Sequence, residues 1–204
     1  MQPLPIKKFV LETYGCQMNT ADSELVEGIL LNLGLEKTQD LHDADAIFLN
    51  TCAIRENAEV KVHSRLGNLH KIKRSKPHLI IGVLGCMAQN LKDDLLKNKP
   101  YVDIILGPDS YRNIPKLMNR HLTEKKSIVD TKLSRYEVYE DMFPSRGDTF
   151  NAWVSIMRGC DKFCSFCIVP FTRGRERSRS VESVVTEVKL SLIHISEPTD
   201  VEES

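Results

Sequence analysis

Short apolar runs alternate with longer amphipathic segments through the first 130 residues of this 204-residue chain. This alternation constrains the fold more than any other feature, because apolar runs of this length predict strands and the amphipathic segments predict helices. Strands that alternate with helices indicate an α/β fold with a parallel sheet and helices on its faces. The expected strands are residues 9–14, 46–50, 79–84 and 102–106, and the expected helices are residues 20–33, 55–75 and 89–98.

The pattern changes after residue 130. Residues 131–150 are polar and contain Pro144 and Gly147 near their end, so they predict a linker. A new strand over residues 152–157 and a helix over residues 181–189 are expected to follow. We therefore expect a domain over residues 1–130, a linker over 131–150, the start of a second domain over 151–189, and an acidic tail without a clear pattern over 190–204.

The composition excludes several classes of protein. A hydrophobic content of 41% with a net charge of zero argues against disorder. No apolar run approaches the roughly 18 residues that span a membrane, and residues 1–8 lack the apolar segment of a secretory signal. We therefore expect a cytoplasmic monomer without membrane association, whose six cysteines serve a purpose other than disulfide formation.

The strongest chemical signal is the trio Cys160, Cys164 and Cys167, because three thiols within eight residues let one loop surround a compact metal cluster. Three thiolates can bind three irons of a 4Fe–4S cluster and leave the fourth iron open for a ligand. Zinc is an alternative that needs a fourth ligand, for which His194 is the nearest candidate downstream, and buried structural cysteines are another. Three phenylalanines near this loop are expected to shield the cluster from water: Phe163, Phe166 and Phe171.

The other three cysteines, Cys16, Cys52 and Cys86, each follow an expected strand closely. A parallel sheet would bring them to the same edge, where ligands bind in α/β folds. Gly15 and Gly85 precede two of them and permit a close approach of the backbone to a cofactor. This arrangement predicts a second cluster site, although a single cysteine in such a chain is often a small buried apolar residue.

A short basic stretch follows Cys160, Cys164 and Cys167 in the chain. Residues 151–180 carry six basic and two acidic side chains, whereas residues 181–204 carry one basic and six acidic. The arginines alternate, so in an extended chain they would face one way and could bind RNA phosphates. A solvated charged segment is the simpler interpretation, and proximity to the cysteines favours RNA binding. The candidates are Arg173, Arg175, Arg177 and Arg179.

Five blocks together resemble the radical S-adenosylmethionine tRNA methylthiotransferases, and specifically the MiaB-type enzymes that act on isopentenyladenosine beside the anticodon. Sister families modify threonylcarbamoyladenosine or a ribosomal-protein aspartate. The blocks CAIRE and CMAQ are closer to the isopentenyladenosine group than to either sister. The matching blocks are residues 12–19 (ETYGCQMN), 50–58 (NTCAIRENA), 85–89 (GCMAQ), 158–170 (RGCDKFCSFCIVP) and 172–179 (TRGRERSR).

The resemblance implies an N-terminal parallel-sheet methylthiotransferase domain, followed by the first strand and helix of a truncated radical-SAM partial (β/α) barrel. It implies that Cys160, Cys164 and Cys167 hold the 4Fe–4S cluster that binds S-adenosyl-L-methionine. It also implies that a second 4Fe–4S cluster, which supplies sulfur, is held by the other three cysteines, Cys16, Cys52 and Cys86. The implied reaction is methylthiolation at C2 of the adenine in tRNA, supported by a reducing electron donor and a sulfur source. No acid–base catalytic residue is assigned.

The resemblance ends near Lys189, so the chain is expected to lack most of the barrel and the RNA-binding β-barrel that follow in the family. Residues 190–199 do not resemble the family, and we expect them to be foreign sequence. Ser180 also stands where the family usually has proline. The alternatives are a methylthiotransferase acting on threonylcarbamoyladenosine, a non-catalytic zinc- or RNA-binding module, and an inert fragment in which residues after 150 stay disordered.

Overall fold

The computed structural model describes residues 6–53, 56–146 and 151–192. The element order is β1 (Lys8–Tyr14), α1 (Gln17–Asn32), β2 (Glu36–Lys37), β3 (Ala46–Thr51), α2 (Glu56–Ser75), β4 (Ile80–Gly85), α3 (Cys86–Asn90), α4 (Lys92–Asn98), β5 (Ile104–Leu106), the 3₁₀ helix η1 (Tyr111–Asn113), α5 (Ile114–Glu124), β6 (Ile128–Asp130), β7 (Met157–Arg158), α6 (Val169–Thr172), β8 (Arg177–Ser178) and α7 (Val181–Leu192).

Six strands form one sheet in the order β2-β1-β3-β4-β5-β6, and every neighbouring pair is parallel. The expected α/β fold with a parallel sheet is therefore confirmed. All residues of the central strands β3 and β4 are buried, because helices cover both of their faces. Their register aligns Tyr14 of β1 with Thr51 of β3, and Thr51 with Gly85 of β4, so the three strands end level with one another.

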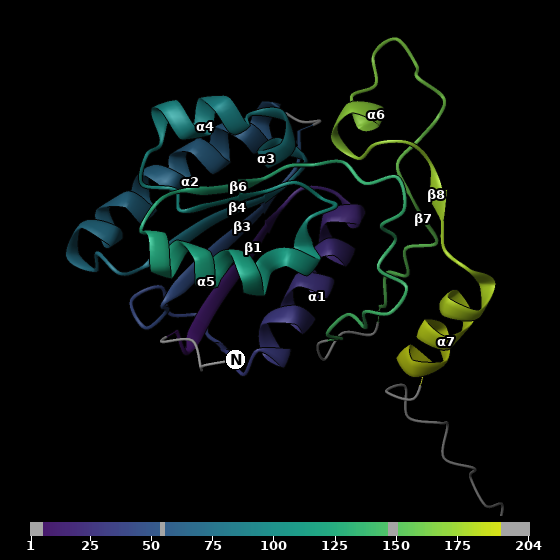
Figure 1. The fold of residues 1–204 in the computed structure, drawn as a ribbon, viewed down its shortest axis with the longest axis horizontal. Coiled ribbons are helices and arrows are strands. Elements are labelled where there is room, and N and C mark those ends of the chain that lie inside the picture. The colour runs from purple at the N-terminus through teal and green to yellow at the C-terminus, as the bar shows by residue number, and fades with distance from the viewer. Residues whose placement is uncertain (1–5, 54–55, 147–150, 193–204) are drawn as a thin grey trace, which may run out of the picture.

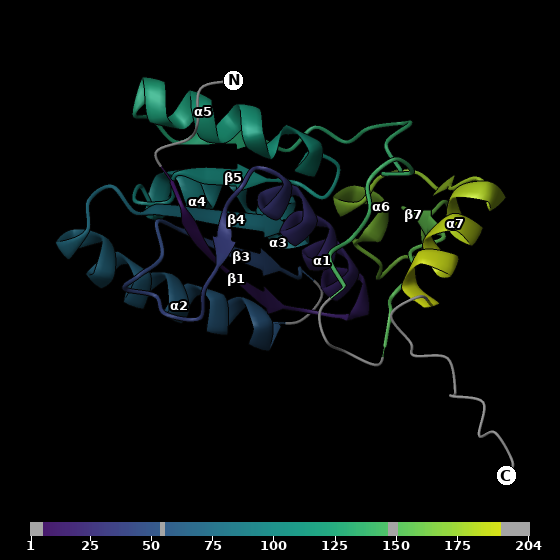
Figure 2. The same ribbon diagram turned by 90° about the horizontal axis from the view of Figure 1, so that it is seen from below.

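Helices α1 and α5 cover one face of the sheet, and α2, α3 and α4 cover the other (Figures 1 and 2). Successive strand residues point to opposite faces. Phe48 accordingly packs in the cluster with α1 and α5, whereas its neighbours Ile47 and Leu49 pack in the cluster with α2, α3 and α4. These two apolar layers form the core.

Two helix boundaries differ from the sequence prediction. Helix α1 begins at Gln17 rather than at Thr20, because Cys16 is the N-cap and its backbone N–H donates to Asn19 Oδ1 at 3.2 Å. The expected helix over residues 89–98 is two helices, α3 and α4. Its first part begins three residues earlier, at Cys86, and the two parts are separated at Leu91, whose φ of −111° is not helical.

Residues 131–146 contain no helix or strand, yet they are packed against the sheet domain. Tyr139 is 3% exposed, its ring stacks on Tyr111, and its hydroxyl donates to the carbonyl of Pro108 at 3.0 Å. Tyr139 therefore helps to anchor the segment from 131 to 146, together with ion pairs such as Glu137–Arg112.

The region from 151 to 192 contains little regular structure before its final helix. The expected strand over residues 152–157 is wrong, because β7 is confined to Met157–Arg158 and pairs antiparallel with the equally short β8. The expected helix at residues 181–189 is confirmed by α7. His194 lies outside the described residues. None of the helices in the described part of the chain is long and apolar enough to cross a membrane.

Candidate functional site

Three cysteines lie at the C-terminal edge of three adjacent strands. Cys16 follows β1 as the N-cap of α1, Cys52 directly follows β3, and Cys86 is the first residue of α3, directly after β4. The backbone N–H of Cys52 also donates to the carbonyl of Tyr14 at 2.9 Å, which extends the pairing of β1 and β3 to the cysteine itself. The structure thus brings these three sequence candidates to one edge. Cys52 and Cys86 are buried, and Cys16 is partly exposed.

A buried pair of asparagines fixes the backbone beneath these cysteines. The side-chain amide of Asn19 donates to Asn50 Oδ1 at 3.2 Å and to the Thr51 carbonyl at 3.1 Å. The amide of Asn50 donates in return to the Asn19 carbonyl at 2.9 Å. Gly85 adopts a φ of +91°, and a Cβ there would lie 2.5 Å from Asn50 Oδ1, so a glycine is required. Sequence reasoning missed the asparagines, although Asn19 and Asn50 lie three and two residues from cysteines.

The second set of cysteines lies on a loop between β7 and α6. The backbone N–H of Cys160 donates to the Gly174 carbonyl at 3.1 Å, and that of Cys167 donates to the Cys164 carbonyl at 2.9 Å. Cys160 and Cys167 are partly exposed and Cys164 is exposed. Gly159 has a φ of +75°, and its Cβ would lie 2.0 Å from the Arg175 carbonyl, so the loop lies directly against residues 174–175.

The phenylalanines of this loop do not bury themselves as expected. Phe163, Phe166 and Phe171 are 47%, 91% and 67% exposed. Phe163 and Phe171 make an edge-to-face contact with ring centroids 6.2 Å apart, and the Arg175 guanidinium lies 5.1 Å from the Phe163 ring. The expectation that they shield the cysteines from water is wrong for the described residues, because no further part of the chain covers them there.

None of the six cysteines, all of which lie in the described residues, forms a disulfide. Within residues 6–53, 56–146 and 151–192, no three His, Cys, Asp or Glu side chains are arranged as a metal-binding group. Two sets of three thiols nevertheless suit iron–sulfur clusters chemically, because thiolates are the usual ligands of such clusters. The fold brings Cys16, Cys52 and Cys86 to one edge, and metal binding there requires their side chains to turn toward a common point.

The four candidate arginines do not face one way. Arg173 and Arg177 are 5% and 7% exposed, and each binds a buried carboxylate. Arg179 binds Glu187 in α7. Arg175 is exposed and pairs with Asp161 at 3.1 Å. The expectation of a single phosphate-facing row is therefore wrong, because Gly174 has a φ of +74° and turns the backbone before the short strand β8.

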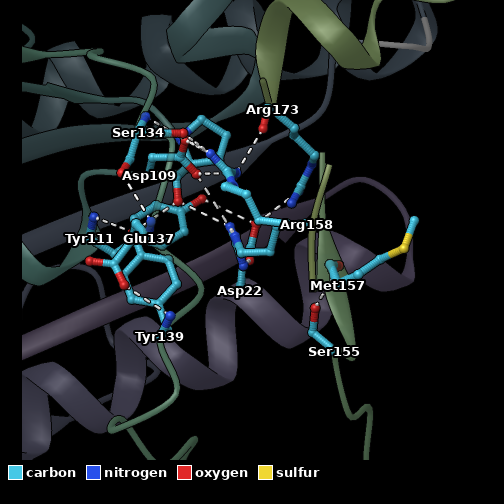
Figure 3. A network of polar contacts seen from close by, with 12 residues as sticks. Asp22, Asp109, Tyr111, Ser134, Glu137, Tyr139, Ser155, Met157, Arg158 and Arg173 are labelled. Carbon is cyan, nitrogen blue, oxygen red and sulfur yellow. Dashed lines mark hydrogen bonds and ion pairs between the residues drawn. The ribbon is translucent and has the colours of Figure 1, made fainter. Parts of the chain in front are cut away.

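Arg173 and Arg177 belong to a buried ionic network that joins residues 158–177 to the sheet domain (Figure 3). Asp22 of α1 accepts hydrogen bonds from Arg158 Nη1 and from Arg173 Nη2, both at 2.8 Å. Asp109, after β5, accepts two from Arg177 at 2.8 and 3.0 Å. Arg158 also donates to the Pro108 carbonyl at 3.0 Å and lies 4.9 Å from the Tyr139 ring.

One arginine of this network contacts a sheet-edge cysteine. Arg173 Nε donates to Cys86 Sγ at 3.2 Å. Burial raises the pKa of the Cys86 thiol, and the positive charge of Arg173 acts in the opposite direction. Burial by itself would also raise the pKa of Asp22, but Arg158 and Arg173 outweigh it and hold that pKa below its usual value. Asp22 is therefore a buried carboxylate kept charged by two guanidiniums. Sequence reasoning missed this role of Asp22.

Most of the chain is similar in sequence to known proteins. Residues 8–107, which contain the sheet-edge cysteines, match the family described as "Uncharacterized protein family UPF0004". The chain is 50% identical over 184 residues to the tRNA-2-methylthio-N(6)-dimethylallyladenosine synthase of Bacteroides fragilis, covering 89% of this chain and 40% of that protein. Synthases of the same name from Amoebophilus asiaticus and Chloroherpeton thalassium are 51% identical over 187 residues and 49% over 179, covering 91% and 88% of this chain and 38% and 40% of theirs.

The chain spans about two-fifths of the length of these curated relatives. The match nevertheless extends over about nine-tenths of the chain itself, so it includes most of the region after residue 130 as well as the sheet domain. Over about nine-tenths of its length the chain is therefore similar in sequence to curated proteins named tRNA-2-methylthio-N(6)-dimethylallyladenosine synthase.

Proposed function

We propose that the chain is the cluster-bearing part of a radical-SAM tRNA methylthiotransferase that modifies C2 of N6-isopentenyladenosine beside the anticodon. The observation that carries the proposal is the placement of Cys16, Cys52 and Cys86 at one edge of three adjacent parallel strands. This edge lies in a chain that is 50% identical over 184 residues to the tRNA-2-methylthio-N(6)-dimethylallyladenosine synthase of Bacteroides fragilis. The proposed partners are tRNA, a reducing electron donor and a sulfur source.

In this proposal Cys160, Cys164 and Cys167 hold one 4Fe–4S cluster, which binds S-adenosyl-L-methionine. The sheet-edge cysteines, Cys16, Cys52 and Cys86, hold the other 4Fe–4S cluster. When bound, the cluster on Cys160, Cys164 and Cys167 would supply the electron that cleaves S-adenosyl-L-methionine, and the sheet-edge cluster would supply sulfur. We also propose the division into residues 1–130, 131–150 and 151–189, with β7, α6, β8 and α7 as the start of the partial barrel. The proposed location is the cytoplasm, and the proposed state is a monomer.

The chain's own residues have physical tasks in such an enzyme. Cys52 and Cys86 are 2% and 3% exposed, so the sheet edge excludes most water from two of its three thiols. Asp22 and Asp109 bind Arg158, Arg173 and Arg177, and so hold residues 158–177 against the sheet domain. Arg175 is the arginine of the basic stretch that stays exposed, and it is the candidate of the four for contact with an RNA phosphate.

Metal analysis separates this proposal from a zinc- or RNA-binding module. After anaerobic reconstitution of the chain with iron and sulfide, we expect about eight irons and eight sulfides per chain, as two 4Fe–4S clusters contain. Electron paramagnetic resonance of the reduced protein should show iron–sulfur signals. Zinc at the cysteines without iron–sulfur absorption would contradict the proposal.

The substrate is tested by a chimera, because the relatives extend well beyond the matched region. Residues 1–189 of this chain would replace the matching part of the Bacteroides fragilis synthase, in a bacterium that lacks its own tRNA methylthiolation. We expect mass spectrometry of digested tRNA to detect 2-methylthio-N6-isopentenyladenosine, and a Cys16→Ala chimera to lose it. A methylthiolated threonylcarbamoyladenosine in its place would favour the sister activity and contradict the proposal.

A further inference from the structure

Two consecutive residues, Arg173 and Gly174, connect the two sets of cysteines. The guanidinium of Arg173 donates from Nε to Cys86 Sγ at 3.2 Å, at the sheet edge. The residue that follows it, Gly174, accepts the backbone N–H of Cys160 at 3.1 Å, in the other set. Helix α6, which ends next to Arg173, packs against α3, which begins at Cys86. The segment 173–174 therefore contacts one cysteine of each set.

The guanidinium of Arg173 is held in place by more than its contact with sulfur. Nη2 donates to Asp22 Oδ2 at 2.8 Å, and the carbonyl of Arg173 accepts from Arg177 Nη2 at 2.9 Å. The residue is 5% exposed, so water competes little for its donors. A planar guanidinium that is fixed at one nitrogen has its other N–H groups fixed in direction as well.

One donor of this guanidinium remains without a partner. Within the described residues, the buried Nη1 of Arg173 donates to no hydrogen-bond acceptor. A buried donor without a partner is unfavourable, so such donors are rare in folded proteins and call for an explanation. A donor beside a cysteine sulfur is suited to bind a further sulfur atom held next to that cysteine.

We propose that Arg173 is a positioning residue of the sheet-edge cluster, which directs N–H groups and a permanent positive charge at the sulfur side of Cys86 and thereby raises the reduction potential of a cluster bound there. This inference rests on the proposed function, because it needs a cluster at Cys16, Cys52 and Cys86. Hydrogen bonds to the sulfurs and the net charge nearby are two of the properties that set the potential of an iron–sulfur cluster. Both stabilise the reduced form, which carries one more negative charge.

The test measures the sheet-edge cluster by itself. The full chain carrying Cys160→Ala, Cys164→Ala and Cys167→Ala is reconstituted with iron and sulfide, and its midpoint potential is determined by redox titration with electron paramagnetic resonance. We expect Arg173→Met to lower the ratio of reduced to oxidised cluster about tenfold at the midpoint potential of the parent, which corresponds to about 59 mV for one electron. Arg173→Lys keeps the charge and should lower the ratio less than Arg173→Met.

Arg177→Met is the matched control. Arg177 is about as buried as Arg173 and binds Asp109 as Arg173 binds Asp22. It contacts the backbone carbonyl of Arg173, and among the described residues none of its hydrogen bonds or ion pairs is with a cysteine. We expect its ratio to stay within about twofold of the parent, well short of a tenfold or 59 mV change. An Arg173→Met ratio within twofold of the parent overturns the proposal, as does an equal fall in Arg177→Met.

A second measurement needs no folded Arg173→Met protein. Arginine labelled with ¹⁵N is incorporated into the chain, and pulsed electron paramagnetic resonance of the reduced sheet-edge cluster detects nearby ¹⁵N nuclei. We expect a ¹⁵N coupling in the parent that disappears in Arg173→Lys and persists in Arg177→Lys. Absence of coupling in the parent, or its persistence in Arg173→Lys, overturns the role of Arg173 alone. A parent protein that takes up no iron at the sheet edge overturns the proposed function together with it.

Discussion

The two sets of cysteines stand on different kinds of support. Cys16, Cys52 and Cys86 follow three strands whose ends are aligned by a continuous parallel ladder, with apolar helices on both faces. Cys160, Cys164 and Cys167 lie on a loop that is closed by a pair of two-residue strands, with its phenylalanines exposed. The first set is positioned by the core of a domain, and the second by a few backbone contacts.

The buried residues of the two regions differ in the same way. The core of the sheet domain is apolar, whereas the buried side chains of the described residues after 150 are mostly polar or charged, including Arg158, Arg173, Arg177 and Glu187. Large apolar side chains of this region, such as Ile156 and Val181, are 61% and 74% exposed. Residues 151–192 are therefore attached to the sheet domain by ion pairs rather than by apolar burial. Each prediction below tests this difference.

The largest effect is expected at Asp22. Asp22→Asn removes the carboxylate shared by Arg158 and Arg173 and leaves both buried guanidiniums without it. Removing one partner of a buried ion pair costs about 3–5 kcal/mol. Urea unfolding should report a loss of this size, whereas Asp43→Asn, which removes an exposed partner of Lys8, should cost about 0–1 kcal/mol. Equal losses in the two variants would contradict the ionic attachment.

Apolar truncations should separate the two regions. Leu66 in α2 is fully buried, so Leu66→Ala should destabilise the chain by about 2–5 kcal/mol. Val185 in α7 is 44% exposed, and Val185→Ala should change the free energy of unfolding by about 0.5 kcal/mol or less. Urea denaturation measures both. A large loss in Val185→Ala would show that α7 is attached by apolar contacts after all.

Glycine substitutions should distinguish a crowded position from an open one. Gly159 and Gly34 both have a positive φ, but a Cβ at Gly159 would lie 2.0 Å from the Arg175 carbonyl, whereas at Gly34 nothing lies within 4 Å. Gly159→Ala should therefore displace the loop and speed hydrogen exchange of the Cys160 amide about tenfold, equivalent to about 1.4 kcal/mol. Gly34→Ala should leave that amide unchanged. No change in Gly159→Ala would refute the close packing of the loop on Arg175.

The pH dependence should be the smallest effect. The pKa of Asp22 is lower in the folded chain than the usual value of about 3.9 for an unfolded chain. Its charge therefore stabilises the fold above that usual value, and the stabilisation is lost as the pH falls through the lowered folded pKa. Acid unfolding of Asp22→Asn should accordingly depend less steeply on pH below about 4 than that of the parent. If the parent and Asp22→Asn show the same pH dependence of acid unfolding, another carboxylate causes that dependence.

The sequence pattern predicts the sheet and the sheet-edge cysteines because both follow from local order along the chain. Short apolar runs locate β1, β3 and β4, and a parallel sheet then brings Cys16, Cys52 and Cys86 to one edge. Strand β2 is not predicted from the sequence, because it is a two-residue edge strand and both of its residues are exposed. Strand β6 is not predicted either, because its three residues are too few to form a recognisable pattern.

The sequence does not predict the ionic network, because its pairs join residues far apart in the chain. Asp22 meets Arg158 and Arg173 across separations of 136 and 151 residues. Alternation of the arginines suggests an extended, solvent-facing row. Gly174 instead turns the backbone, and all four side chains pair with carboxylates, three of them away from solvent. The burial of these arginines can be recognised only when the fold shows which carboxylates they bind.

The central claim is that the sheet edge forms a cluster site of its own, independent of the loop that carries the other three cysteines. The most direct measurement is the iron content and Mössbauer spectrum of the anaerobically reconstituted Cys160→Ala, Cys164→Ala, Cys167→Ala chain. We predict that about four irons remain, with the spectrum of one 4Fe–4S cluster, and that they are lost when Cys16, Cys52 and Cys86 are also replaced by alanine. A chain that retains no iron when the loop cysteines alone are replaced would contradict the claim.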